Sequence, residues 1–336
     1  SRWPSPCWAA PAGCSPRVLD ALRALTANQV GFYPPYNVVT GRAARYFGVT
    51  TDEIALTNGL DEGIMATCIA HLRPAIGGFV PEVVVPEPAF EIYKYDTALA
   101  GGVVRHVAPR TDFTLPLDAV LAAVTERTRM VCLTSPNNPT GVSVTLDDIR
   151  TVARAVPAGA LVFVDEAYAE FEGRTFIPHL AEYPNVIVGR TFSKAHGLAG
   201  LRVGALLAQA DTLLPIRAAI PTYSLSVAAV VALQASLDDP GYLEDYIRQV
   251  AESKALLYAA CDRLGLRYWK SDANFVLVHA GDRTAALIAG AADRGVYFRN
   301  RSTEAGCAGC FRFGTGIVEH TRRGIAAMEE ALCALA

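Results

Sequence analysis

The sequence predicts an α/β fold: a three-layer domain with a mostly parallel, mixed sheet, followed by a smaller α+β domain. Three observations indicate this. Short apolar runs alternate with helical patterns between residues 54 and 207. After about residue 230 the pattern changes to one long helical stretch, followed by short strands and two helices. The 336 residues are typical of two domains, and 51% hydrophobic residues allow a large core.

We divide the chain into three parts. Residues 1–30 are predicted to form an N-terminal arm and helix that pack with the smaller domain, residues 31–230 the large domain, and residues 231–336 the small C-terminal domain. Ser15 as N-cap and Pro16 at the first helical position favour a helix from Arg17 to Leu25. Consecutive prolines make residues 31–36 a loop that displays aromatic side chains.

The remaining elements follow from apolar spacing along the chain. Strands are predicted at residues 54–56, 83–85, 103–104, 130–133, 160–164, 186–188 and 203–207 of the large domain, and at 274–279, 295–299 and 310–314 of the small one. Helices are predicted at residues 41–47, 64–72, 117–124, 146–155, 242–264, 284–294 and 321–335.

The stretch from Arg190 to Arg202 contains the strongest chemical signal. Lys194 lies just beyond a predicted buried strand, with hydroxyls at Thr191 and Ser193 and a guanidinium at Arg202. Lysine forms Schiff bases with aldehydes, whereas hydroxyls and guanidinium groups bind phosphate. The set therefore favours pyridoxal 5'-phosphate, a cofactor that carries both an aldehyde and a phosphate.

A second signal is the glycine-containing turn at residues 57–63, which leads into a predicted helix. Free backbone N–H groups and the helix dipole favour a bound phosphate at such a turn. Phe90, Asn138, Asp165 and Lys194 all follow predicted strand ends. Because ligands of open α/β sheets bind at the carboxyl ends of the strands, these side chains are expected to converge.

Composition excludes several classes of partner. The net charge of -3 and the absence of basic runs argue against nucleic acid and anionic membrane surfaces. No apolar stretch is long enough to span a bilayer and the first residues lack a signal pattern, so a cytoplasmic protein is expected. The Cys307-Ala-Gly-Cys310 spacing has no second pair nearby, so we interpret it as a loop and predict no metal site.

Three motifs identify a family by resemblance: Ser135-Pro-Asn-Asn-Pro-Thr-Gly141, Val164-Asp-Glu-Ala-Tyr168 and Thr191-Phe-Ser-Lys-Ala-His-Gly-Leu-Ala-Gly-Leu-Arg202. They resemble the class I/II aminotransferases of fold type I, which use pyridoxal phosphate, and within them the histidinol-phosphate aminotransferase group. The resemblance extends from about Pro11 to the C-terminus. It implies a homodimer with shared active sites that moves an amino group from a small-molecule donor to a 2-oxo acid.

The resemblance assigns roles around the cofactor. It implies that Lys194 forms the Schiff base and moves the proton, that Asp165 pairs with the pyridine nitrogen, and that Asn138 and Tyr168 hydrogen-bond the phenolic oxygen. Phe90 would stack on the ring. Phosphate would be held by Thr191, Ser193, Arg202 and the Gly59-Leu60-Asp61 turn, and Tyr33 would reach the phosphate in the neighbouring subunit. A tyrosine that merely packs in a proline loop is the alternative for Tyr33.

Three residues are implied on the substrate side. Arg312, in Cys310-Phe-Arg-Phe-Gly314, would bind a carboxylate or phosphate, and Arg299 would add a second contact to substrate phosphate. Asn274 matches another substrate position. A surface role for Arg299 and a strand-edge role for Asn274 stay open, and His196 is interpreted as a packing residue.

The substrate itself stays open, because Trp8-Ala-Ala-Pro-Ala12 departs from the polar arm of the group. The leading hypothesis is amino-group transfer from an amino acid or amino-phosphate donor, similar to histidinol phosphate. One alternative is a pyridoxal-phosphate decarboxylase, or an elimination or cyclisation enzyme of specialised metabolism. The other is a cofactor-sensing regulator, which would need a DNA-binding segment. Donor, acceptor and pathway are not fixed by the sequence.

Overall fold

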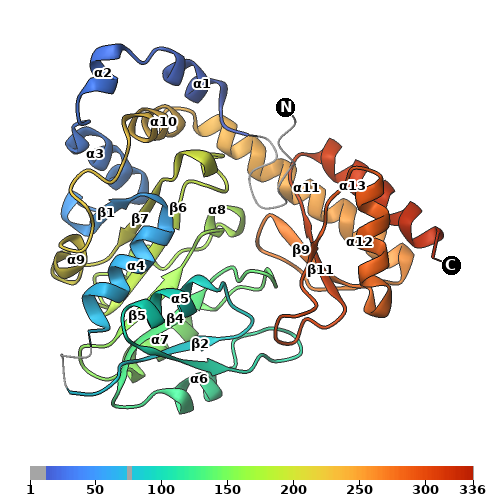
Figure 1. Cartoon of the computed structure of the whole chain (residues 1–336), viewed down its shortest axis with the longest axis horizontal. Coiled ribbons are helices and arrows are strands. Elements are labelled where there is room, and N and C mark those ends of the chain that lie inside the picture. Colours follow the sequence, from blue (N-terminus) through green and yellow to red (C-terminus); the bar gives the residue numbers. More distant parts are fainter. Residues whose placement is uncertain (1–12, 74–77, 336) are drawn as a thin grey trace.

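The computed structural model describes residues 13–73 and 78–335, and these contain two separate sheets (Figure 1). One sheet has seven strands and the other has four. The predicted α/β architecture is confirmed, as is the mixed sheet. The Trp8–Ala12 arm lies outside the described residues.

The larger sheet has the strand order β1-β7-β6-β5-β4-β2-β3. Only β7 runs against its neighbours in this sheet, since the pairs among β2, β3, β4, β5 and β6 are parallel and β1 is antiparallel to β7. The strands are β1 (Ile54–Thr57), β2 (Glu82–Pro86), β3 (Val103–Val107), β4 (Thr128–Thr134), β5 (Leu161–Asp165), β6 (Val186–Thr191) and β7 (Gly204–Leu207).

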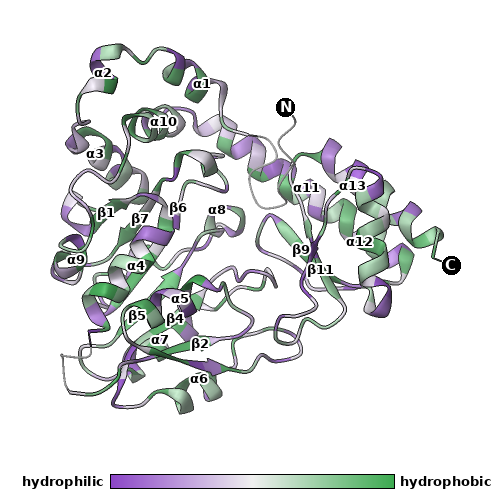
Figure 2. Ribbon diagram, in the orientation of Figure 1, coloured by the Kyte–Doolittle hydropathy of each residue, from purple (hydrophilic) through white to green (hydrophobic). Residues whose placement is uncertain are grey.

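Both faces of this sheet are buried, which explains the continuous apolar runs of its central strands (Figure 2). Val162 and Val164 face one core, while Leu161 and Phe163 face the other. The first core is covered by α1 (Pro16–Arg23), α3 (Tyr36–Phe47), α6 (Leu117–Ala123), α7 (Leu146–Ala155) and α10 (Val227–Leu237). The second is covered by α4 (Gly59–His71), α5 (Ile92–Leu99) and α9 (Ala210–Arg217).

The smaller sheet has the order β10-β11-β9-β8, with every pair antiparallel. Its strands are β8 (Arg267–Tyr268), β9 (Phe275–His279), β10 (Arg299–Asn300) and β11 (Cys310–Gly314). The helices α11 (Pro240–Leu264), α12 (Thr284–Asp293) and α13 (Val318–Cys333) share a core with it. The strand predicted at residues 295–299 was wrong in extent, because only Arg299 and Asn300 pair with β11.

The N-terminal helix begins as predicted, since the Ser15 hydroxyl accepts from Arg17 N and Pro16 occupies the first position. We predicted that this segment packs with the smaller domain; in its described part, α1 lies against α10, and Val18 belongs to the larger core. Residues 230 and 231 lie inside α10, so a domain division at that point stays a prediction.

The loop predicted at residues 31–36 is shorter in the structure. α2 (Ala27–Gly31) ends on one side of the two prolines, and α3 already begins at Tyr36. The helix expected from residue 41 begins five residues earlier, at Tyr36. Pro35 is its N-cap, a position that a proline can occupy because no helical N–H bond is needed there. The remaining short elements are α8 (Ala169–Glu172) and the 3-10 turns at Thr51–Glu53, Ile177–His179, Ala199–Leu201 and Gly281–Arg283.

Two absences hold for the described part of the chain. No helix within it is long and apolar enough to span a membrane. Within the same residues, no group of three or more His, Cys, Asp or Glu side chains is placed to hold a metal ion. Cys307 and Cys310 are buried free thiols, and burial raises the thiol pKa to about 12 and about 11 respectively.

Candidate active site

A pocket of about 390 Å³ lies at the carboxyl ends of β4, β5 and β6, beside the start of α4. This is the edge at which the sequence placed the informative residues, because the three strands are parallel and end side by side. The predicted residues that line it are Leu60, Asp61, Phe90, Asn138, Asp165, Tyr168, Thr191, Ser193, Lys194, Arg202 and Arg312.

Lys194 and Asp165 lie in the same pocket but come from neighbouring strands. Lys194 follows β6, and its Nζ lies 5.6 Å from the centroid of the Tyr168 ring. Asp165 ends β5 and is only 5% exposed. Its Oδ1 accepts from Ala167 N at 3.0 Å and its Oδ2 accepts from the Tyr93 hydroxyl at 2.5 Å.

The environment of Asp165 suits a cationic partner. Burial raises the pKa of this carboxyl, and the hydrogen bonds from Tyr93 and Ala167 oppose the rise. A buried carboxylate stays ionised when a positive group pairs with it. The protonated nitrogen of a pyridine ring is such a group, so the site fits pyridoxal phosphate on this side.

The other end of the pocket is an anion cradle. Gly59 begins α4 with a φ of +77°, and a Cβ added there would lie 2.4 Å from Arg202 Nη2. Glycine thus lets the guanidinium approach the N–H groups of the helix start. Arg202 Nη2 donates to Asp61 Oδ2 at 2.6 Å, and the hydroxyls of Thr191 and Ser193 line the same pocket. A helix start, an arginine and two hydroxyls form the donor set that a phosphate requires.

The smaller sheet closes the pocket through Arg312. This side chain is 2% exposed, and its Nη1 donates to Asn138 Oδ1 at 2.5 Å. Its guanidinium lies 4.8 Å from the Phe275 ring, which in turn meets the Tyr168 ring edge-on at 5.1 Å. The contacts join the end of β4 to β11 across the pocket, so an arginine from the small sheet faces groups of the large one.

Four predicted residues are absent from the lining. Gly59 acts through its backbone, as described above. Asn274 is buried, and its carbonyl accepts from Thr315 N at 2.8 Å. Arg299 is exposed on β10, directly opposite Arg312. Tyr33 is 72% exposed and stacks on Tyr223 with 4.0 Å between ring centroids, so it does not reach the pocket of its own chain.

Sequence reasoning missed Tyr93, which is 1% exposed. It lies three residues after Phe90, in the first turn of α5, and its backbone N donates to Phe90 O at 3.4 Å. That spacing was the available signal. Ile64, Thr134, Ala167 and Ala199 also line the pocket without having been predicted, and nothing in their residue types marks them. His196 is 3% exposed and lies outside the pocket lining.

Comparison with known proteins gives a consistent result. Residues 9–327 match the family model described as aminotransferase class I and II. A histidinol-phosphate aminotransferase of Symbiobacterium thermophilum is 37% identical over 96% of this chain and 88% of that protein. One from Methanocella arvoryzae is 36% identical over 86% of this chain and 78% of that protein.

Solved structures agree with these sequence matches. The crystal structure of a histidinol-phosphate aminotransferase from Sinorhizobium meliloti, in complex with pyridoxal 5'-phosphate, superposes with a TM-score of 0.85 and 27% identity, covering 98% of this chain and 90% of that chain. The aspartate aminotransferase of Thermus thermophilus with maleate gives a TM-score of 0.80 at 21% identity, over 96% of this chain and 90% of that chain. The second match concerns the fold alone.

Proposed function

The chain belongs to the class I and II aminotransferases, enzymes of fold type I that use pyridoxal 5'-phosphate, and we propose that its amino donor carries a phosphate. The acceptor in this proposal is a 2-oxo acid. The observation that supports this reaction is that Lys194, Asp165 and the anion cradle line one pocket. When bound, the cofactor supplies an aldehyde that condenses with amines and a ring that accepts electrons from the neighbouring carbon.

Each side chain of the pocket would have a separate role toward the cofactor. Lys194 would hold the aldehyde carbon of the bound cofactor, and its Nζ would move the proton at the α-carbon of the donor. Asp165 would pair with the pyridine nitrogen and keep it protonated. Asn138 and Tyr168 would hydrogen-bond the phenolic oxygen, and Phe90 would stack on the ring. Thr191, Ser193, Arg202 and the N–H groups of Leu60 and Asp61 would hold the phosphate.

Two arginines support a donor that carries a phosphate. Arg299 and Arg312 are directly opposite each other on β10 and β11, so their side chains leave the same face of the small sheet. Arg312 lines the pocket. Like charges in opposite positions disfavour each other unless an anion lies between them. A phosphate dianion fits such a pair, and histidinol phosphate is the donor named in the relatives.

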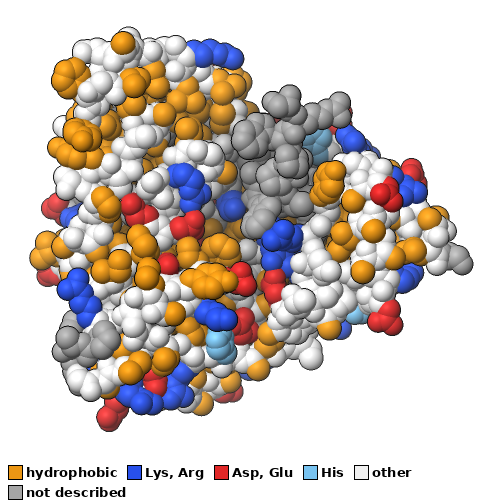
Figure 3. Space-filling view, viewed as in Figure 1, with side chains coloured by type: hydrophobic (Ala, Val, Ile, Leu, Met, Phe, Trp, Pro, Cys, Tyr) orange, Lys and Arg blue, Asp and Glu red, His pale blue; other side chains and the backbone are white. Residues whose placement is uncertain are grey.

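The proposal includes a homodimer whose subunits share active sites. Large apolar side chains are exposed in and after α2, in α3 and ahead of α10: Val30, Phe32, Tyr33, Val38 and Tyr223. Figure 3 shows hydrophobic side chains gathered at the upper left, where Figure 1 places α2, α3 and α10. A groove of about 420 Å³ is lined by Phe32, Tyr33 and Val38 of this face together with Val227, Val230 and Val231 of α10. Apolar faces of this kind mark protein–protein contacts. In a dimer formed through this face, Tyr33 would contribute its hydroxyl to the cofactor phosphate of the partner subunit.

The test is a donor panel with a matched pair of substrates. Purified enzyme loaded with pyridoxal phosphate is given histidinol phosphate, histidinol, and ordinary amino acids, with 2-oxoglutarate as acceptor. We expect glutamate to form, fastest with the phosphorylated donor, and the Arg299→Ala variant to raise KM for that donor alone. Release of carbon dioxide would contradict amino-group transfer and indicate a decarboxylase. A product that retains its amine would indicate an elimination or cyclisation enzyme.

A further inference from the structure

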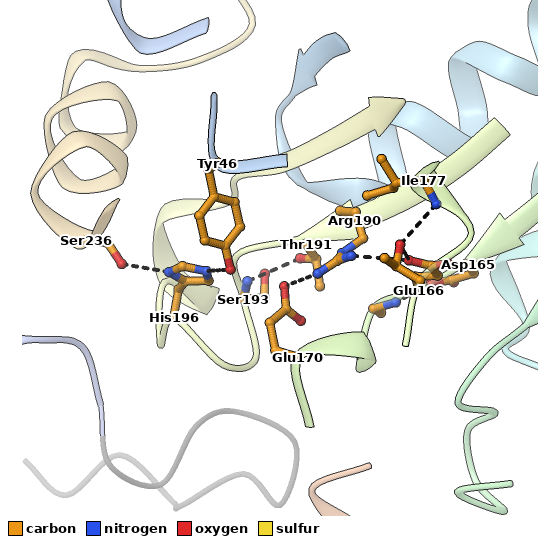
Figure 4. Close-up of polar contacts among 12 residues, drawn as sticks. Tyr46, Asp165, Glu166, Glu170, Ile177, Arg190, Thr191, Ser193, His196 and Ser236 are labelled. Atoms are coloured by element: carbon orange, nitrogen blue, oxygen red, sulfur yellow. Dashed lines mark hydrogen bonds and ion pairs between the residues drawn. The ribbon is translucent and has the colours of Figure 1, made fainter. Parts of the chain in front are cut away.

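A buried cluster of charged side chains lies directly behind the pocket, among residues that sequence reasoning left without a role (Figure 4). Arg190 Nη1 lies 3.2 Å from Glu166 Oε2, and Arg190 Nη2 lies 2.6 Å from Glu170 Oε1. The three side chains are between 4% and 7% exposed. We call Arg190, Glu166 and Glu170 the Arg190 cluster.

Each member of the Arg190 cluster is a close chain neighbour of a pocket residue. Glu166 follows Asp165 directly after the end of β5, and Asp165 lines the pocket whereas Glu166 does not. Glu170 comes two residues after Tyr168, in the short helix α8. Arg190 precedes Thr191 at the end of β6, four residues before Lys194. One guanidinium therefore joins the segments that carry Asp165, Tyr168 and Lys194.

Backbone hydrogen bonds hold part of these segments, since Arg190 and Thr191 pair with Ala205 and Gly204 of β7. The ladder between β5 and β6 ends with the pair Asp165 and Gly189, followed by one bond from Glu166 N to Gly189 O at 2.9 Å. Side chains add further contacts around these residues. Glu166 also accepts from Thr175 Oγ1 at 2.6 Å and from Phe176 N at 2.7 Å, so both of its oxygens are engaged.

Burial and ion pairing act in opposite directions on the pKa values of Arg190 and Glu166. Burial opposes the charge of Arg190, but Glu170 and Glu166 raise the pKa of its guanidinium above the ordinary value. Burial raises the pKa of Glu166, and Arg190 opposes that rise. A buried ion cluster adds little net stability compared with apolar residues of equal volume, and its better attested effect is to specify one arrangement of the chain. Because the Arg190 cluster lies directly behind the pocket, we expect it to act mainly by holding the pocket residues in one arrangement.

The loop that carries Lys194 is also held by side-chain contacts after the lysine, at His196. His196 Nδ1 lies 2.9 Å from Ser236 Oγ on α10, and its Nε2 lies 3.3 Å from the Tyr46 hydroxyl on α3. The ring of Phe47, next to Tyr46, lies 5.1 Å from the Arg190 guanidinium. Lys194 thus lies between two side-chain anchors, Arg190 on one side and His196 on the other.

We propose that Arg190 is a positioning residue of the transferase, which through Glu166 and Glu170 sets Asp165 and Tyr168 relative to Lys194. The inference rests on the proposed function only in that pyridoxal phosphate occupies the pocket. Its effect passes through the three pocket residues, since Arg190 does not line the pocket. A displacement of about 1 Å among groups that hold a reacting centre is enough to lower rates substantially.

The test compares Arg190→Met with a matched change elsewhere in the same sheet. Arg105 pairs with the buried Glu82 through two bonds of 2.5 and 3.0 Å, at the end of β2 opposite to the pocket. Arg105→Met therefore removes an arginine from a buried carboxylate without touching the site. For wild type and both variants, we would measure the free energy of unfolding without cofactor, the dissociation constant for pyridoxal phosphate by equilibrium dialysis, and kcat and KM.

We expect both variants to lose stability, but only Arg190→Met to weaken cofactor binding and lower kcat, each by about ten-fold or more. Arg190→Lys should recover part of the loss, because a lysine can hold one carboxylate but lacks the fork that holds two. A folded Arg190→Met enzyme that binds cofactor and turns over within about two-fold of wild type would overturn the proposal.

If Arg190→Met fails to fold, Glu170→Gln decides the matter, because it keeps the side-chain shape and removes one charge. A weaker cofactor complex in that variant supports the proposal, whereas wild-type affinity and kcat contradict it. Failure of the function itself would look different. In that case the wild-type protein would bind no pyridoxal phosphate, or would bind it without transferring amino groups.

Discussion

At the scale of single residues, Asp165 depends on one neighbour that is buried beside it. The Tyr93 hydroxyl donates to Asp165 Oδ2 at 2.5 Å and lies 3.4 Å from Thr134 Oγ1. Burial raises the pKa of Asp165 and the Tyr93 hydroxyl lowers it. The ionised form of the carboxyl, which the pyridine nitrogen requires, is therefore supported by a phenol that has no contact with the substrate in this account.

Replacing Tyr93 by phenylalanine should weaken that support. Loss of a hydrogen bond to a charged group is expected to lower kcat/KM by about ten-fold. Without this hydrogen bond the pKa of Asp165 rises, so less of the carboxyl is ionised at acidic pH. The decrease in kcat/KM should therefore be greatest at acidic pH and become smaller as the pH rises. Steady-state kinetics from pH 6 to 9, roughly, would check this. Tyr183→Phe is the control, because that hydroxyl is bound by Arg154 at 2.7 Å, away from the pocket. Equal effects of the two changes at every pH would contradict the role of Tyr93.

His196 gives a pH-dependent contribution to stability. Burial lowers its pKa to about 4 from an ordinary value of 6.5, with Glu170 raising it and Arg190 lowering it. Between these pH values the unfolded chain binds a proton that the folded chain does not, so stability falls as the pH decreases. One such proton corresponds to about 1.4 kcal/mol per pH unit. The free energy of unfolding of His196→Gln, measured by urea unfolding at several pH values, should fall less steeply between pH 6.5 and 4 than that of the wild type, by up to this amount per pH unit. The same pH dependence in both proteins would contradict the role of His196.

At the scale of secondary-structure elements, the phosphate cradle depends on how closely β7 passes the start of α4. A Cβ added at Gly204 would lie 2.5 Å from Leu60 N and 2.6 Å from Gly59 C, both backbone atoms that cannot rotate away. The glycine therefore lets the helix start lie directly against the strand. Gly200, a few residues earlier, has open space at the same position.

Gly204→Ala should displace the N-terminus of α4. Overpacking of this kind typically costs about 1–3 kcal/mol of stability. It should also weaken pyridoxal phosphate binding by about ten-fold, because the N–H groups of the helix start move from the phosphate. Gly200→Ala is the matched control and should bind like wild type. Equilibrium dialysis of both variants distinguishes the outcomes, and wild-type affinity in Gly204→Ala would contradict this picture of the cradle.

Much of the element pattern could be predicted from the sequence, because parallel strands buried on both faces give continuous apolar runs. The helices α5 and α10 were missed for physical reasons. α10 is apolar on nearly all sides, since it packs against both α1 and α3, and so it lacks a polar face. α5 has eight residues, too few for a clear period. The reversed direction of β7 depends on its connection to β6, which side-chain periodicity does not encode.

The candidate site shows a similar division. Residues that touch the predicted cofactor lie in local motifs, so the sequence located them. Arg190 and Glu166 lie in the same motifs, but their pairing depends on the register of β5 and β6, which no local pattern gives. Tyr33 and Arg299 are exposed in the single chain, and their roles stay predictions.

At the scale of the whole molecule, the proposed dimer can be tested by mixing inactive subunits. Tyr33→Ala and Lys194→Ala each damage a site if Tyr33 reaches across the interface. In a mixed dimer, the Lys194 of one chain meets the Tyr33 of the other, which restores one site. Random mixing makes half of the dimers mixed, so co-expression should give about a quarter of the wild-type activity.

Two other results are informative in that experiment. Activity no higher than that of the separate variants would contradict a shared site, even if the protein is a dimer by analytical ultracentrifugation. A monomeric wild-type protein would contradict the docking of the apolar face formed by α2, α3 and α10.

Lys194 is the side chain expected to carry the cofactor, and reductive trapping can show whether it does. Treatment of the pyridoxal-phosphate-loaded enzyme with borohydride fixes the cofactor to the amine that holds it, and peptide mass spectrometry then locates the modified lysine. The sequence offers Lys94, Lys254 and Lys270 as internal controls. We expect the label on Lys194 alone, lost when the substrate amine is added before reduction. A label on another lysine, or none at Lys194, would contradict the account.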